Sequence, residues 1–214
     1  MNVKELRGRG FDIQYTCISH TWGRWEKHSS PVHVMGVNEW MVPENTIFEV
    51  KDLPQILSNA PIPTRFIWFD LLCIPQDKSQ KLYLVEVSRQ AIMFQHASSC
   101  IAWLNTIHSW THTEAPAHWL CLNYLHRRSQ NSFYNTDELL SRTAEQANNN
   151  IELVVDSGNF IPWLSSLRTL QEACLYPDMI LCNSDWQPVS IPQSTTLSLN
   201  HLLTLYSLNR EAYF

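Results

Sequence analysis

The sequence has few charged residues and no cluster of basic ones. Asp, Glu, Lys and Arg make up 16% of the 214 residues, and the formal net charge is −5 with histidine counted as neutral. A weakly acidic chain without a basic patch has no electrostatic means of attracting nucleic acid or an anionic membrane. We therefore expect neither nucleic acid nor a membrane among its partners.

Long apolar runs and paired cysteines are also missing. No stretch approaches the roughly 18 apolar residues that a membrane helix needs, and residues 1–11 lack the apolar core of a secretory signal. The six cysteines are scattered without a CxxC pair, and several stand in apolar segments, as small buried side chains do. These absences predict a reduced, cytoplasmic protein.

Motifs for binding phosphate or metal are absent or weak. The chain has neither GxGxxG nor a P-loop, which excludes a conventional dinucleotide or phosphate cradle. His108, His112 and His118 are the basis for a third class of function, a metal-dependent hydrolase. Zinc needs at least three converging ligands, and Pro116 argues against a regular helix through these histidines. We therefore expect no metal and no permanently bound cofactor.

Short apolar runs and helical patterns alternate along the chain. Strands are predicted at Tyr15–His20, Phe66–Asp70, Cys100–Leu104 and Met179–Cys182, with Pro188–Ile191 as a short partner of the last. Helices are predicted at Asp52–Ala60, Ser79–Ala97, Ala117–Arg127, Thr136–Gln146 and Trp163–Cys174. This alternation predicts an α/β fold with a mainly parallel sheet covered by helices on both faces.

The predicted helix Ser79–Ala97 is the longest. One of its faces carries apolar residues at spacings of three and four, namely Leu84, Val87, Ala91 and Phe94. Arg89 and Gln90 fall largely on another face. The pattern therefore predicts that the apolar residues pack against the sheet.

Three sequence blocks follow predicted strands or begin helices. In the first, ISHTWGRW, a strand ends at Ser19 and turns through Trp22 and Gly23 towards Trp25. Gly23 allows a close approach of a ligand to the backbone, and the two tryptophans could stack on a planar ring. A structural Trp-Gly turn explains the same residues equally simply.

The second block, IWFDLLCIPQD, places Asp70 at the end of a predicted strand. Such an acid either caps the segment that follows or holds a ribose hydroxyl. The third block, WLSSLRTLQEAC, places Arg168 and Glu172 four residues apart on one face of a helix. An ordinary helical ion pair is the simplest explanation of that spacing.

Together the blocks resemble the fungal heterokaryon incompatibility (HET) domain family, over about residues 15–182. The family pattern is roughly Leu-Ser-Tyr-x-Trp-Gly, then Trp-Ile-Asp-x-x-Cys-Ile-Asn-Gln, then Trp-x-x-Arg-x-Trp-x-x-Gln-Glu. The departures of this sequence from the pattern include His20, Pro75, Ser166 and Arg168. The resemblance implies one HET-like domain over residues 1–214, with a helical insertion at about residues 105–159.

HET domains are distantly similar to TIR domains, so the resemblance implies a flavodoxin/TIR-like sheet and a role in programmed cell death. Some TIR domains cleave NAD between nicotinamide and ribose with a helix glutamate, which corresponds by position to Glu172. NAD would then be a substrate, and Ser19, Trp22, Gly23, Trp25 and Asp70 would bind it. The alternative is a non-enzymatic adaptor that self-associates or binds a sensor protein, in which the same residues only determine the fold.

The scattered cysteines give a first testable prediction. Thiol titration of the denatured chain under non-reducing conditions should find six free thiols. Two or more missing thiols would contradict the cytoplasmic assignment, because a disulfide persists in an oxidising compartment.

Overall fold

The computed structural model describes residues 13–21, 26–27, 30–37, 40–128, 162–191 and 195–210. The predicted helix Thr136–Gln146 lies outside these residues, as do Trp22, Gly23 and Trp25 of the first sequence block.

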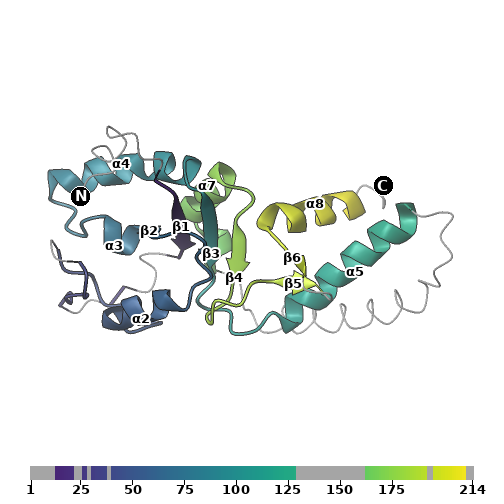
Figure 1. Ribbon diagram of the computed structural model, residues 1–214, viewed down its shortest axis with the longest axis horizontal. Helices are drawn as coiled ribbons and strands as arrows, with labels where there is room; N and C mark the ends of the chain where they lie inside the picture. Colours follow the sequence, from purple (N-terminus) through teal and green to yellow (C-terminus); the bar gives the residue numbers. More distant parts are fainter. Residues whose placement is uncertain are drawn as a thin grey trace.

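A sheet of four parallel strands forms the centre of the fold (Figure 1). Its strands are β1 (Tyr15–His20), β2 (Phe66–Phe69), β3 (Ser99–Trp103) and β4 (Ile180–Cys182). All four lie within one residue of the predicted bounds, and the α/β fold class is confirmed. The strand order β2-β1-β3-β4 is that of flavodoxin-like sheets, in which the switch point between β1 and β3 is where ligands bind.

Helices cover both faces of the sheet. α4 (Lys81–Gln95) and α7 (Leu167–Leu175) pack on one face, and α2 (Leu53–Ser58) packs on the other (Figure 1). Pro54 stands in the first turn of α2, where its missing N–H costs nothing. The other elements are η1 (Val50–Asp52), α3 (Asp70–Cys73), α5 (Thr111–Arg128), η2 (Pro162–Ser165), β5 (Ser190–Ile191), β6 (Thr195–Thr196) and α8 (Leu199–Arg210).

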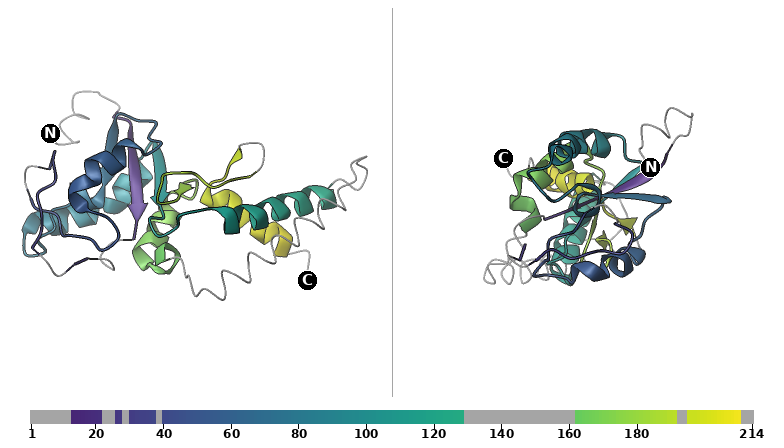
Figure 2. Two further views of the ribbon diagram at one scale, coloured as in Figure 1. Left: turned by 90° about the horizontal axis from the view of Figure 1, so that it is seen from below. Right: turned by 90° about the vertical axis from the view of Figure 1, so that its left-hand side faces the viewer.

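α5 and α8 lie side by side and extend away from the sheet on its β4 side (Figure 2). α5 falls within residues 105–159, the predicted insertion, and begins six residues before the predicted helix. The short antiparallel pair β5–β6 stands between these helices and the sheet. Within the part of the chain that the structure describes, no helix is long and apolar enough to cross a membrane.

Each face of the sheet has its own apolar core. Tyr15 and Cys17 of β1 pack towards α4 and α7, whereas Ile18 packs towards α2, as the alternation of side chains along a strand requires. All six cysteines are free, and three of them, Cys17, Cys100 and Cys182, are buried.

The inward face of α4 differs from the predicted one. Phe94 is fully buried and Val87 packs against the core as predicted, but Leu84 is 65% exposed. Tyr83 and Gln90 take inward positions instead, so the placement of Gln90 on another face is wrong. α4 carries apolar side chains on more than one side, and periodicity alone therefore did not fix which side faces the sheet.

The orientation of α4 gives a test by core truncation. Phe94→Ala should lower the free energy of unfolding by about 3–5 kcal/mol, because Phe94 is fully buried and stacks edge-on against Trp68. Leu84→Ala, a truncation on the exposed side of the same helix, should change it by less than about 0.5 kcal/mol. Chemical denaturation measures both, and an equal loss in the two variants would mean that α4 is rotated.

Candidate functional site

Ser19, Gln90 and Glu172 meet on the face of the sheet that α4 and α7 cover. Ser19 stands near the end of β1 and donates its hydroxyl hydrogen to Glu172 Oε2 over 2.5 Å. Gln90 Nε2, from α4, donates to Glu172 Oε1. All three side chains are buried, and Glu172 is only 4% exposed. The carboxyl group of Glu172 therefore joins three elements that are far apart in the sequence.

A break in the predicted helix Trp163–Cys174 brings a fourth side chain into this network. Ser166 is extended (φ −89°, ψ 123°), so the segment forms η2 and α7 rather than one helix. Trp163 thereby turns back to the end of β1, and its Nε1–H donates to Ser19 Oγ over 2.9 Å. Thr169 holds the break by donating to the backbone oxygens of Trp163 and Ser166.

Burial raises the pKa of Glu172 to about 8, and the negative charge of Asp70 adds to the rise. The hydrogen bond from Ser19, the charge of Arg168 and the hydrogen bond from Gln90 lower this pKa, but each has a smaller effect than burial. A carboxyl group with this pKa is mostly protonated at neutral pH. Glu172 can therefore gain or lose a proton close to physiological pH.

Asp70 lies at the carboxyl end of β2, where α3 begins. Its Oδ1 accepts a hydrogen bond of 2.7 Å from the N–H of Leu71, in the first turn of α3. The same oxygen lies 3.4 Å from His20 Nδ1. Burial lowers the pKa of His20, against the smaller opposing effect of Asp70, so the imidazole is neutral and the contact is not an ion pair. Neither ring nitrogen of His20 has a hydrogen-bond partner among the described residues.

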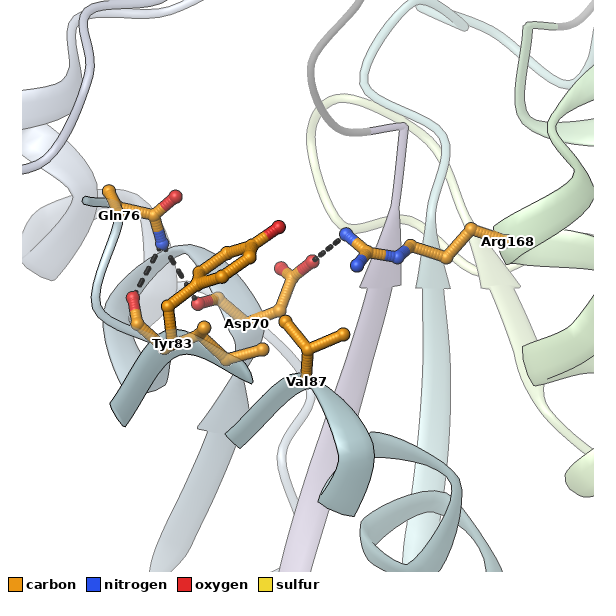
Figure 3. Close-up of a pocket in the computed structure, with 6 residues that line it drawn as sticks. Asp70, Gln76, Tyr83, Val87 and Arg168 are labelled. Carbon is orange, nitrogen blue, oxygen red and sulfur yellow. Dashed lines mark hydrogen bonds and ion pairs between the residues drawn. The ribbon is translucent and has the colours of Figure 1, made fainter. Parts of the chain in front are cut away.

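A small pocket opens between α3, α4 and α7 (Figure 3). Its lining residues are Asp70, Ile74, Gln76, Tyr83, Val87 and Arg168. Arg168 Nη1 lies 4.0 Å from Asp70 Oδ2 across the pocket. The space holds about one water molecule, whereas pockets for whole ligands measure roughly 300–1,000 Å³. Glu172 is not among the lining residues, so it is covered in this form of the protein.

The structure brings together the predicted site residues that it describes. Ser19 and Glu172 are in direct contact, and Asp70 interacts electrostatically with Glu172. Trp22, Gly23 and Trp25 lie outside the described residues. Sequence reasoning missed Gln90, although a polar residue spaced three from Val87 and four from Phe94 shares their face of a helix.

No group of three or more metal-ligating side chains occurs within the described ranges. His108 precedes α5 rather than lying on a helix with His112, and its Nδ1 is 3.0 Å from Ser184 Oγ. The spacing of four between these two histidines therefore does not place them on one helix face.

The strand order and the buried carboxyl group define an α/β domain with a candidate ligand site at the carboxyl edge of its sheet. The family model described as Heterokaryon incompatibility protein (HET) matches residues 15–172, from the first residue of β1 to Glu172. The chain belongs to the HET family, which implies a role in heterokaryon incompatibility and cell-death signalling. Comparisons with curated proteins and with solved structures gave no match.

The raised pKa of Glu172 predicts how stability depends on pH. As the pH rises from the ordinary value of 4.5 towards about 8, the unfolded chain loses this proton while the folded chain keeps it. The contribution of Glu172 to stability therefore falls across this window and levels off above it. Glu172→Gln mimics the protonated side chain, so its melting temperature relative to wild type should increase by several degrees between pH 5 and pH 8.

The exposed Glu49 provides a matched control, since Glu49→Gln removes the same charge outside the site. Its melting temperature relative to wild type should stay nearly constant over the same pH range. A constant difference for Glu172→Gln as well would show that Glu172 titrates like an exposed carboxyl group.

Proposed function

We propose that this HET domain acts by cleaving NAD between nicotinamide and ribose, with Glu172 as its catalytic carboxylate. The observation that carries the proposal is the burial of Glu172 at the carboxyl edge of the sheet, with both carboxyl oxygens hydrogen-bonded. Burying an acid costs stability that a neutral glutamine would not cost. Groups with such shifted pKa values occur preferentially at functional sites.

The reaction suits a single carboxyl group. When the bond between C1′ and the pyridinium nitrogen breaks, its electron pair stays on the nitrogen, and nicotinamide leaves as a neutral molecule. The leaving group therefore needs no general acid. An ionised Glu172 would stabilise the oxocarbenium-like transition state and take a proton from the water that attacks C1′. A pKa of about 8 suits such a base, because it lies near the operating pH.

The substrate itself would help to ionise Glu172. The pyridinium ring of NAD is a cation, and a cation within a few ångströms lowers the pKa of a carboxyl group. The charge of Arg168 already has this effect. Glu172 is covered, and the pocket holds about one water molecule. Binding of NAD must therefore also widen the pocket, and many enzymes move loops or domains in this way when substrate binds.

The other predicted site residues have positioning roles in this proposal. Ser19 orients Glu172, Asp70 faces the sugar, and Gly23 lines the site while Trp22 or Trp25 stacks on a ring of the nucleotide. NAD is a substrate here and not a permanently bound cofactor. A sensor protein or a second copy of the chain would be the partner that brings the domain into its active form.

The proposal is tested by nicotinamide release from NAD. Glu172→Gln should lower the rate on the order of a hundredfold or more, because the substitution removes the charge but keeps the size and helix propensity of the side chain. Thermal melts show whether the fold is intact, and Glu49→Gln should release nicotinamide at the wild-type rate.

Two results would contradict this assignment. Equal rates for wild type and Glu172→Gln would remove Glu172 from the reaction. No release by the wild type, even when it is concentrated or clustered, would favour the non-enzymatic adaptor that signals by self-association.

A further inference from the structure

Gln76 presents a fixed hydrogen-bond acceptor at the pocket. Its Nε2 donates to the backbone oxygens of Asp70, Leu71 and Ile74, over 3.3, 3.2 and 2.6 Å. These three acceptors fix which end of the amide carries the nitrogen, so Oε1 must point the other way. Gln76 Oε1 is buried, and it has no hydrogen-bond partner within the described part of the chain.

Asp70 provides a second acceptor in the same pocket. Its Oδ1 is used by the N–H of Leu71, but Oδ2 has Arg168 Nη1 at 4.0 Å, which is too long for a hydrogen bond. The side chains of Gln76, Tyr83, Asp70 and Arg168 follow one another across the pocket, and Val87 lies below them in the view of Figure 3. Gln76 Oε1 thus has no donor within the described part of the chain, and Asp70 Oδ2, in the same pocket, forms an ion pair with Arg168 rather than a hydrogen bond.

The size of the pocket limits which group can enter it. Space for about one water molecule admits a hydroxyl group but excludes an aromatic ring. Two acceptors that line one pocket match the two neighbouring hydroxyl groups of a ribose, each of which donates one hydrogen. The second hydroxyl group requires the pocket to widen, as the proposed reaction also does. The guanidinium of Arg168 lines the same pocket and its side chain is 31% exposed, which suits an anion at the mouth.

We propose that Gln76 and Asp70 bind the adjacent hydroxyl groups of a ribose, and that Arg168 binds the phosphate attached to that ribose. The choice of a nucleotide as the ligand rests on the proposed function. Gln76 is then the residue that distinguishes ribose from deoxyribose. Buried acceptors that are matched only by the correct hydroxyl reject an analogue without it, since they would be left unpaired.

Binding of AMP tests this subsite without turnover, because AMP contains the ribose phosphate but no nicotinamide. By calorimetric titration, 2′-deoxy-AMP should bind about tenfold or more weakly than AMP, and inorganic phosphate more weakly still. Gln76→Met should bring the ratio of the two affinities close to one, whereas Gln55→Met, on the other face of the sheet, should keep it. Arg168→Gln should weaken AMP and 2′-deoxy-AMP alike.

Equal binding of AMP and 2′-deoxy-AMP by the wild type would overturn the subsite, as would no binding of AMP. This comparison needs no substitution, so it remains decisive if Gln76→Met does not fold. The outcome is also separate from the proposed reaction. A preference for ribose without nicotinamide release would retain the subsite and reject NAD cleavage, and release without the preference would do the reverse.

Discussion

The hydrogen bonds of Glu172 couple the position of α7 to that of β1 and α4. Ser19 and Gln90 each donate a hydrogen bond to one carboxyl oxygen of Glu172. The indole N–H of Trp163 in turn donates to the hydroxyl oxygen of Ser19. Loss of one member leaves the others buried without a partner, which costs about 1–3 kcal/mol for each group. The same contacts therefore hold the helices on the sheet and hold the carboxyl group at its edge.

Burial, and after it the balance of charge at this edge, explains why Glu172 keeps its proton. Asp70 and Arg168 lie across the pocket from each other with opposite charges, and His20 beside them is neutral because burial lowers its pKa. A second negative charge on Glu172 would face the charge of Asp70, which is one of the causes that raise the pKa of Glu172. The site can thus accept one more positive charge, which is the charge that a pyridinium ring carries.

The sheet could be predicted from the sequence because each of its strands is a short apolar run. Tyr15–His20 is buried along its whole length, and its predicted bounds are those of β1. The orientation of α4 could not be predicted, since Leu84 and Phe94 are both apolar while only the second is buried. The inward position of Gln90 depends on its partner Glu172, which is 82 residues away in the sequence.

Part of the candidate site was proposed from the sequence, through strand ends and through the family resemblance. Ser19 and Asp70 were proposed from their places at strand ends, which parallel strands bring to one edge, whereas Glu172 was proposed from the resemblance to the HET and TIR families. Gln76 was not found, because the pattern alone does not show that its amide nitrogen is held by three backbone oxygens. The break at Ser166 was also missed, since the residues on both sides of it favour a helix.

The directions of the hydrogen bonds indicate what the acid at position 172 adds to the fold. As an ionised group, Glu172 accepts from both Ser19 and Gln90. As a protonated group it must donate one hydrogen bond, so either the hydroxyl of Ser19 or the amide of Gln90 has to turn. A glutamine would meet the same two partners without any ionisation, and it would hold the helices equally well. Glu172 therefore adds nothing to the fold that a glutamine would not provide. What distinguishes it is a proton that can leave when a cation approaches.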